Sequence, residues 1–533
     1  MKNPKLYIAV AVLSSGMMLT SCSQDFLEPE PTTKGAAGAA GDPLNINSGL
    51  AASYQILGFD SYANGSYESS VFIGDIQSDD AWKGGGDAND GMNGMNLAVS
   101  MFNTSGNLTL SGTWNIYTSG ITRVNSVLGL VETATTTNPA EVDLIRKYKA
   151  EALFLRAYYL YMLWRSFGAV PFQETLFEPP YVCRQLTPDE VYAQIIKDVD
   201  GSIESFTDAE MSTNDGTNDG RASLAAAYML KARAVMYQKD QARYQEAAKG
   251  LAAVIKSGKF SLVKDYASMW LQPGEFGSES IFEANLVPGS KDWGTAWNPG
   301  GTNLPSYISP SSLADDPGFK DGWGFCPVRT ETYEMFEKGD QRRDASIRDL
   351  RGDATGGNVG DKNTTPWGAS YVLRFQDTGF WMAKYSARNS YRKPTGTGEL
   401  NWCNNLRIFR YAETLLNYAE LVLMDGVAEQ QGVSAKECFN QVRRRAFGDN
   451  NHDIANPTAQ EIKDEYHYEF VGEGHRYYDL VRWGDAAKVL TENDEKHNSV
   501  RTWNDYNKYL PIPQSEIDRT MGTEYALKQN PGY

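Results

Sequence analysis

The sequence predicts a mainly α-helical fold, in which paired helices form a scaffold around a large loop-rich insert. Long segments whose apolar residues recur at helical spacing lie mainly within residues 142–258 and 404–492. Between them, residues 260–403 are rich in Gly, Pro, Asn, Trp and Tyr and contain only short apolar runs. We expect the ordered chain to begin near Pro43, with loops also dominant over residues 43–110.

The first helical region has clear helix ends. Ile145–Phe167 is long and periodic and is followed by Gly168, a residue type that commonly ends helices. Leu186–Phe206 begins with a capping box, in which the Thr187 and Glu190 side chains satisfy free backbone amides. Both segments are therefore predicted to be helices that start and stop at defined residues.

Two further segments, Ala222–Tyr237 and Arg243–Ser257, carry alanines along one side, so that paired helices can approach closely. The second helical region continues with Arg407–Met424, Ser434–Ala446 and Thr458–Phe470. The length and pattern of these segments resemble tetratricopeptide helix hairpins, of which we expect about four. Within the insert, short strands are expected at residues 280–284 and 371–375.

Acidic and basic residues alternate with aromatic residues between Glu465 and Gly484. Four of them recur at spacings of four, four and three, which puts them on one stripe of a helix: Glu465, Glu469, Glu473 and Arg476. Gly472 and Gly474 indicate a helix junction or close backbone packing. The ionic residues are either an acid/base site around Glu473, His475 and Arg476 or a buried ion-pair network, and the surrounding aromatic surface favours the network.

The string E-G-H-R-Y-Y-D-L-V-R-W-G at 473–484 resembles the C-terminal signature of the SusD/RagB family of outer-membrane nutrient-binding lipoproteins. Residues 74–81 (G-D-I-Q-S-D-D-A), 406–420 and 509–533 resemble further blocks of that family, so the resemblance covers most of the chain. One position departs, because Glu465 is followed by Tyr466 where the family usually has arginine. The resemblance implies a nutrient-capturing protein that works with a SusC-like TonB-dependent outer-membrane transporter.

The N-terminus has the features of a lipoprotein signal peptide over residues 1–21. Lys2 and Lys5 precede an apolar stretch that is too short to span a bilayer as a mature helix. Leu-Thr-Ser-Cys at 19–22 resembles a lipobox, which implies acylation of Cys22, followed by a flexible tether over residues 22–42. We therefore expect a lipid-anchored protein on the outer membrane at the cell surface; ordinary secretory cleavage is the alternative.

Composition excludes some classes of function. The formal charge of −17 argues against binding to nucleic acid. Motifs for nucleophilic catalysis, catalytic zinc and phosphate cradles are missing, so we expect no enzymatic activity. A surface glycoside hydrolase remains an alternative, because that chemistry needs only two suitably spaced carboxylates among 67 acidic residues. Four cysteines besides Cys22 show no disulfide framework and are expected to be mostly free and buried.

Aromatic side chains dominate the candidate ligand site. The chain contains 12 Trp and 30 Tyr, and several tryptophans lie among Gly, Asp, Asn and Pro in loops, where stacking on an oligosaccharide is possible. Trp82, Trp293 and Trp297 are the leading candidates, and Trp82 is expected to be exposed. The full candidate set is Trp82, Asn89, Asp90, Trp293, Trp297, Tyr307, Trp323, Trp367 and Arg388. A RagB-like peptide-binding protein is the alternative.

An acidic, Gly-rich loop at residues 75–90 raises the question of a metal ion. Asp79 and Asp80 are weak calcium candidates, because hard cations take several oxygen ligands, but their spacing is not that of an EF-hand. Solvated loop carboxylates are more common, so we expect no cofactor apart from this candidate structural calcium.

Overall fold

The computed structural model describes residues 41–61, 69–91, 95, 111–217, 219–287, 289–294, 297–391 and 396–533. The predicted signal peptide, the lipidation residue Cys22 and nearly all of the tether lie outside the described residues. Among the residues that are described, no helix combines the length and the apolar composition needed to cross a membrane.

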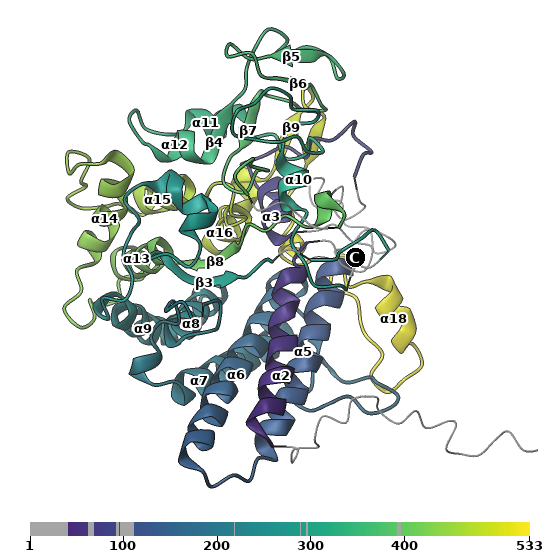
Figure 1. Cartoon of the computed structure of the whole chain (residues 1–533), viewed down its shortest axis with the longest axis vertical. Helices are drawn as coiled ribbons and strands as arrows, with labels where there is room; N and C mark the ends of the chain where they lie inside the picture. Colours follow the sequence, from purple (N-terminus) through teal and green to yellow (C-terminus); the bar gives the residue numbers. More distant parts are fainter. Residues whose placement is uncertain are drawn as a thin grey trace, which may run out of the picture.

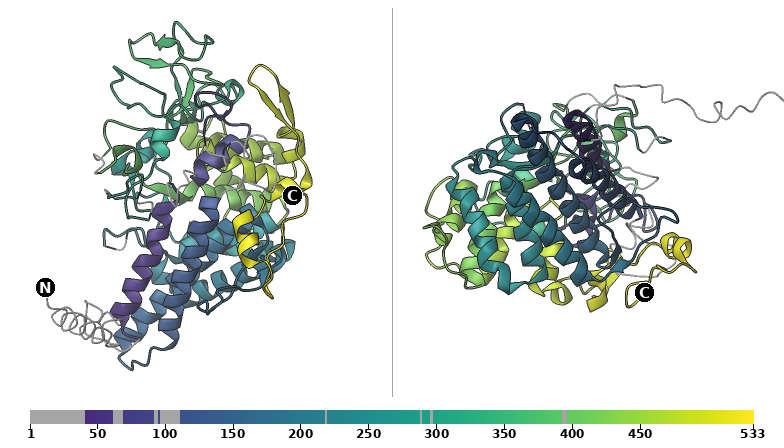
Figure 2. Two further views of the ribbon diagram at one scale, coloured as in Figure 1. Left: turned by 90° about the vertical axis from the view of Figure 1, so that its right-hand side faces the viewer. Right: turned by 90° about the horizontal axis from the view of Figure 1, so that it is seen from below.

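Long helices pack side by side in chain order to form the scaffold, as predicted (Figure 1). They are α2 (Pro43–Tyr54), α5 (Ser111–Glu132), α6 (Pro139–Phe167), α7 (Pro188–Ser205), α8 (Leu224–Gln238) and α9 (Tyr244–Lys256). The array continues from α9 onto α13 (Tyr411–Ala419), followed by α14 (Ala435–Phe447), α15 (Ala459–Phe470) and α16 (Arg476–Trp483). Figure 2 shows the helices gathered at one end of the molecule and the loop-rich insert at the other.

Local sequence signals set most helix ends. α6 ends at Gly168, whose φ of 66° is readily adopted only by glycine, and α7 begins with the full capping box of Thr187 and Glu190. α15 begins with an equivalent box at Thr458 and Glu461. These predictions are confirmed to within a few residues.

The predicted helix over Arg407–Met424 is wrong in its first part. Leu406–Arg410 is a strand, β8, which pairs antiparallel with β3 (Ser280–Ala284), and α13 begins only at Tyr411 before a π-helical turn, η8 (Glu420–Met424). All five residues of β8 are buried, so its apolar and charged side chains show no polar face that would mark it as a strand. Residues 43–54, predicted to be loop, form helix α2.

The insert consists of short elements and loops, as expected. Its helices are α10 (Leu304–Ile308), α11 (Thr330–Glu334) and α12 (Arg342–Ser346). Its strands form two-stranded pairs: β4 (Ile347–Asp349) with β7 (Phe380–Met382), and β5 (Lys362–Thr364) with β6 (Ser370–Val372). In the C-terminal region, the hairpin β9 (Glu492–Asp494)–β10 (Ser499–Arg501) reaches up to the insert (Figure 1).

A buried network of ionic side chains joins the insert to the helices. Its members are five cations and five anions: Arg342, Lys384, Arg410, Arg443 and Arg445 with Glu279, Asp340, Glu465, Glu469 and Glu473. Each of these ten residues is less than a tenth exposed, so the network is buried. At its edge, Arg443 also pairs with a sixth carboxylate, Glu337, which is 41% exposed. Glu469 alone lies 2.6–3.1 Å from three arginines. This confirms the network interpretation of the acidic and basic residues between Glu465 and Glu473.

The two glycines of the signature form a junction between α15 and α16, also as predicted. Both have positive φ, 77° at Gly472 and 72° at Gly474. A Cβ on Gly474 would lie 2.8 Å from the Cα of Val71, on α3 (Ser70–Gln77). The junction therefore interrupts the predicted helical stripe, and its glycines let α3 pack closely against the backbone there. As a result, Arg476 pairs with Asp79, at 2.8 Å, and not with the glutamates.

Candidate functional site

Four aromatic rings of the insert and α3 form a continuous group that ends at the surface. Trp293 is 44% exposed, and its ring centroid lies 6.1 Å from that of half-buried Trp323, with 31° between their planes. Trp323 meets the ring of Tyr307 edge to face at 4.7 Å, and Tyr307 stacks on Phe72 at 4.9 Å. Tyr307 and Phe72 are buried, so they support Trp323 from below while Trp293 faces solvent.

The loop that carries Trp293 is held by buried polar groups. The Lys291 ammonium donates hydrogen bonds to the carbonyls of Gly58 and Gly301, both at 2.6 Å. The side chain of Asn401 accepts from the backbone N–H of Lys291 and donates to its carbonyl. These bonds anchor the backbone at Lys291, two residues before Trp293, and an anchored segment loses less conformational entropy when a ligand binds.

Burial strongly affects the charge of Lys291. The side chain is fully buried, and this desolvation lowers the pKa of the Lys291 ammonium to about 7, while the carboxylate of Asp60 acts in the opposite direction. The carbonyls of Gly58 and Gly301 offset part of the cost of removing Lys291 from water, since both the ammonium and the neutral amine can donate hydrogen bonds to them.

Trp297 belongs to the same region but is less accessible. Its ring is half-buried and meets Phe59 edge to face at 5.1 Å. The side chain of the neighbouring Asn298 donates to the carbonyl of Ser290 at 3.2 Å. Trp297 therefore lies at the base of the Trp293 loop and offers only part of its ring surface.

Residues 82–85 pair with residues 324–327 and bring a second candidate loop next to Trp323. The backbone N–H of Gly85 donates to Gly324 at 2.9 Å, and that of Cys326 donates to Lys83 at 2.9 Å. The loop that follows carries exposed Asn89 and half-buried Asp90, two predicted ligand residues. Its shape is fixed by the Lys83 ammonium, which donates to three carbonyls in residues 87–90.

Arg374 is a candidate that the sequence analysis missed. Its guanidinium lies 3.3 Å from Asp90, and its side chain covers Gly324, beside Trp323. The Arg374 Nε atom is buried without a hydrogen-bond partner. Its place at the end of the apolar run Tyr371–Phe375 made it look like a residue at a strand end, so the sequence held no signal for this role.

Trp82 is buried, so the expectation that it is exposed is wrong. It is 4% exposed and lies between the guanidinium of Arg329, 3.7 Å from its ring centroid, and the imidazole of His497, at 4.5 Å. His497 belongs to the β9–β10 hairpin, which contributes Glu492 to an ion pair with Arg329 at 2.6 Å. Glycine and aspartate neighbours in the sequence gave no indication of these distant partners.

The two remaining predicted residues are Trp367 and Arg388. Trp367 is 51% exposed at the tip of the β5–β6 hairpin, at the upper end of the molecule in Figure 1. The guanidiniums of Arg388 and Arg348 lie on the ring of Phe319, at 4.4 and 3.7 Å. Arg388 therefore has a packing role within the insert.

Asp79 and Asp80 already have protein partners. Asp79 accepts two hydrogen bonds from Arg476, at 2.8 and 3.0 Å, and Asp80 lies 2.5 Å from His467. Ligand atoms of Asp79, Asp80 and His467 lie within 4.8 Å of one another. A guanidinium on one carboxylate and an imidazole on the other do not fit the all-oxygen coordination that calcium prefers.

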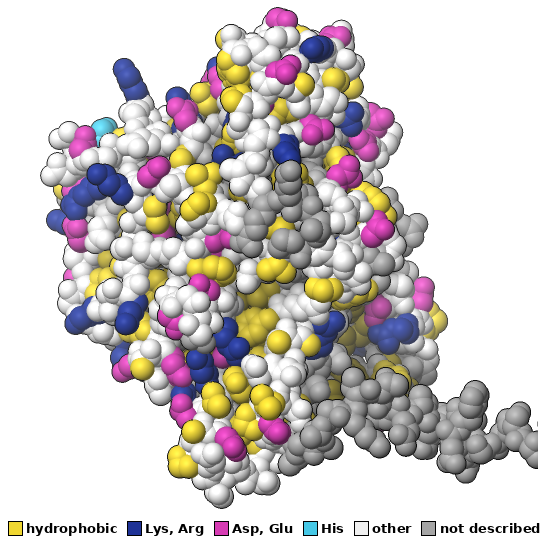
Figure 3. Space-filling view, in the orientation of Figure 1, with side chains coloured by type: hydrophobic (Ala, Val, Ile, Leu, Met, Phe, Trp, Pro, Cys, Tyr) yellow, Lys and Arg dark blue, Asp and Glu magenta, His cyan; other side chains and the backbone are white. Residues whose placement is uncertain are grey.

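The face of the molecule drawn in Figure 3 is chemically mixed. Acidic and basic side chains are interspersed over the face drawn in Figure 3, with hydrophobic side chains in small groups between them. Cys183, Cys326, Cys403 and Cys438 are all buried and free among the described residues, as expected. The arrangement of Trp293 and Trp323 suits a ligand with a flat apolar face and polar edges.

Comparison with known proteins identifies the family. The profile of the SusD family matches residues 279–533, and a profile described as "Starch-binding associating with outer membrane" matches residues 25–236. The starch-binding protein SusD of Bacteroides thetaiotaomicron is 25% identical, covering 98% of this chain and 97% of its own length.

Solved structures agree with this result. Surface glycan-binding protein A from Bacteroides fluxus is 50% identical, with a TM-score of 0.84, and the match covers 94% of this chain and all of the other. The corresponding protein from Bacteroides thetaiotaomicron, in complex with laminarihexaose, is 35% identical over 91% of this chain and 99% of its own, with a TM-score of 0.80. Together with the helical scaffold and the signature at 473–484, these matches show that the chain belongs to the SusD family.

Proposed function

We propose that this protein captures oligosaccharides of the laminarin type without transforming them. The observation that carries the proposal is the pair formed by exposed Trp293 and half-buried Trp323, at 6.1 Å and 31°. The C–H face of a glucopyranose ring is flat and apolar, and it stacks favourably on an indole. Two indoles inclined to each other offer successive stacking surfaces to a chain that curves.

Polar groups beside the rings complete the requirement for sugar recognition. Hydroxyl groups both donate and accept hydrogen bonds, so they need partners of both kinds. Exposed Asn89 offers an amide, and Arg374 and Asp90 offer a guanidinium and a carboxylate next to the Trp323 segment. The relatives support the ligand class, because one was solved with laminarihexaose and another, 28% identical, is a laminarin-binding SusD-like protein.

Delivery of the captured glycan to a SusC-like TonB-dependent transporter is part of the proposal. It is supported by family membership and by the lipobox at 19–22, which predicts an acyl anchor on Cys22. Metabolic labelling with a palmitate analogue tests the anchor: wild-type protein should become labelled and fractionate with the outer membrane, and Cys22→Ala should do neither. Co-purification with a SusC-like transporter from the same outer membrane tests the partnership.

Calorimetry with a ligand panel tests the binding function. We expect laminarihexaose to bind, maltohexaose to bind more weakly, and a mixture of unstructured oligopeptides to give no heat of binding. Binding of peptides alone would replace the proposal with a peptide-capturing function. A sensitive assay for new reducing ends during long incubation with laminarin should show none, and sustained release would make the protein a hydrolase.

A further inference from the structure

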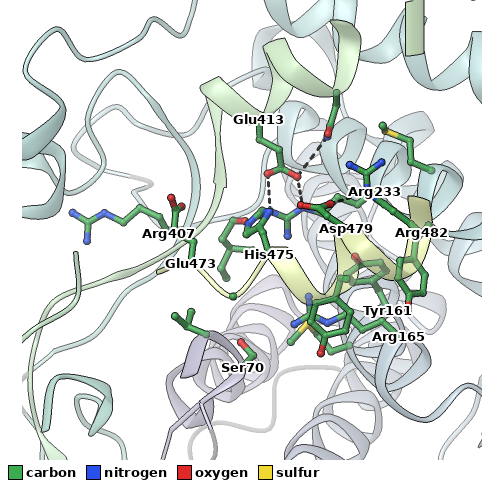
Figure 4. A pocket seen from close by; sticks show the side chains of 18 of the residues that line it. Ser70, Tyr161, Arg165, Arg233, Arg407, Glu413, Glu473, His475, Asp479 and Arg482 are labelled. Carbon is green, nitrogen blue, oxygen red and sulfur yellow. Dashed lines mark hydrogen bonds and ion pairs between the residues drawn. The ribbon is translucent and has the colours of Figure 1, made fainter. Parts of the chain in front are cut away.

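The ammonium of Lys83 is buried against backbone carbonyls. In the scaffold cavity shown in Figure 4, a cation faces a carboxylate, as Arg233 does with Glu413. Lys83, by contrast, is 3% exposed and donates hydrogen bonds to three carbonyls within residues 87–90, two of them at 3.1 Å. Several carbonyl oxygens around one positive charge are also what a loop offers to a bound calcium ion.

This loop belongs to the acidic, Gly-rich stretch whose composition suggested a bound cation. The Asp87 carboxylate accepts hydrogen bonds from the backbone N–H groups of Asn89 and Asp90, at 2.7 and 3.0 Å, and so stabilises the turn itself. Burial lowers the pKa of the Lys83 ammonium, and the carboxylates of Asp90 and Asp87 oppose this effect. Lys83 therefore supplies the positive charge that a metal ion would bring to this loop.

The segment that carries Lys83 is fixed to the insert. The Lys83 carbonyl accepts a hydrogen bond from the backbone N–H of Cys326 at 2.9 Å. At Gly85, where the loop leaves this segment, φ is 85° and a Cβ would lie 2.5 Å from the ring of Phe325, so glycine alone fits. The Lys83 side chain then ties the far end of the loop back to the same fixed segment.

The far end of the loop lies beside the proposed glycan site. The Asp90 carboxylate accepts a hydrogen bond from the N–H of Gly86 at 2.6 Å and lies 3.3 Å from the guanidinium of Arg374. Arg374 in turn covers the neighbour of Trp323, because a Cβ on Gly324 would lie 2.6 Å from the Arg374 Cγ atom. A shift of the loop would therefore displace a carboxylate and a guanidinium beside Trp323.

We propose that Lys83 is a positioning residue of the glycan site, whose ammonium holds Asn89 and Asp90 in the arrangement that binds sugar hydroxyls. The inference rests on the proposed function, since Asn89 and Asp90 contact sugar only if that site is correct. The three N–H groups of Lys83 are used by the loop carbonyls, so Lys83 acts through the loop and touches no ligand. A loop that is ordered beforehand loses less entropy when the sugar binds.

Calorimetry with laminarihexaose tests the proposal. Lys83→Met keeps an unbranched side chain that cannot donate, and it should weaken Kd about tenfold, since fixing the backbone of one further residue costs about that factor. The control Lys197→Met, at a side chain that is 60% exposed, should bind as wild type. Absence of binding by the wild-type protein would refute the proposed function. Wild-type affinity in Lys83→Met would refute this inference alone.

Two further readouts separate positioning from a general loss of stability. In a double-mutant cycle, the affinity losses of Lys83→Met and Asp90→Ala should be far from additive, because Lys83 acts through the loop that carries Asp90. Additive losses would contradict this role. The atoms removed in Lys83→Ala correspond to n-propylammonium, which should restore affinity when added in excess, whereas neutral n-propanol should not. Absence of rescue, or equal rescue by both compounds, would contradict the need for a cation.

Hydrogen exchange of the wild-type protein needs no variant, so a folding defect cannot obscure it. The backbone N–H groups of Gly86, Asn89 and Asp90 are hydrogen-bonded within the loop. They should exchange slowly before ligand is added and change little when it binds. Fast exchange in the free protein that slows only with laminarihexaose would show that the ligand, and not Lys83, orders the loop, and would overturn the proposal.

Discussion

Replacing Trp293 with alanine should weaken binding of laminarihexaose about tenfold. A tryptophan side chain buries about 250 Å² when fully covered, and Trp293 is 44% exposed, so about 110 Å² is available to a ligand. A sugar that covers one ring face removes about half of this from water. At about 25 cal/mol per Å², the loss is about 1.4 kcal/mol, or one order of magnitude in Kd.

Calorimetry of Trp293→Ala and Trp82→Ala with the same ligand separates binding from stability. Trp82 is 4% exposed between Arg329 and His497, so its loss should leave Kd unchanged and lower the free energy of unfolding by about 3–5 kcal/mol. Trp293→Ala should show the opposite pattern, with a weaker Kd and an almost unchanged Tm. An exposed aromatic side chain elsewhere, Tyr525, provides the control, because Tyr525→Ala should change neither.

The opposite result would refute the placement of the site. If Trp82→Ala weakened binding while Tm stayed constant, the β9–β10 hairpin would have to open to expose Trp82 to ligand. If Trp293→Ala bound as wild type, the exposed indole would not contact sugar. In either case the stacking surface would lie outside the Trp293–Trp323 pair.

Three further predictions concern the framework that supports this site. Glu469→Gln should lower the free energy of unfolding, measured in urea, by about 3–5 kcal/mol, because three arginines lose a shared counter-ion. Burial acts to raise the pKa of Glu469, but these arginines hold it below its usual value. The stabilisation is therefore present above about pH 4 and is lost as the pH falls further. An unchanged urea midpoint would show that the network contributes little. Gly474→Ala should cost about 2 kcal/mol, since φ is 72° and the new Cβ would lie 2.8 Å from the Cα of Val71; a normal Tm would mean that α3 shifts freely. The pKa of Lys291 is about 7 in the folded protein and near 10.4 in the unfolded chain, so the unfolded chain binds more protons between these pH values and stability rises with pH across them. Lys291→Met should reduce this slope by up to about 1.4 kcal/mol per pH unit. Lys197→Met, at an exposed position, should leave the slope unchanged.

Features that depend on neighbouring residues were predictable from the sequence. Gly168 ends α6 and the Thr187–Glu190 box begins α7, because capping is decided within one helical turn. The junction at Gly472 and Gly474 was predictable for the same reason. The strand at Leu406–Arg410 was not, because its identity depends on pairing with Ser280–Ala284, more than a hundred residues away.

The candidate site shows the same limit more sharply. Trp82 and Trp293 have similar neighbours in the sequence, glycine and aspartate, and yet one is buried and the other exposed. The difference comes from Arg329 and His497, which cover Trp82 from distant parts of the chain. Arg374 was missed because its contact with Asp90 spans 284 residues. Exposure of a loop tryptophan is a property of tertiary structure and cannot be taken from local composition.

The signature at 473–484 is therefore explained by its role in joining parts of the fold. Its first residue, Glu473, belongs to the buried ion-pair network that joins the insert to the helices. Arg476, in α16, pairs with Asp79, two residues after the end of α3. The Trp293 loop is held separately, by Lys291 and Asn401. The residues that hold the Trp293 loop share no ion pair with the signature residues Glu473 and Arg476. Substitutions around Trp293 can therefore alter ligand preference without weakening the attachment of the insert to the helices. The effects on stability of one substitution in each group should add.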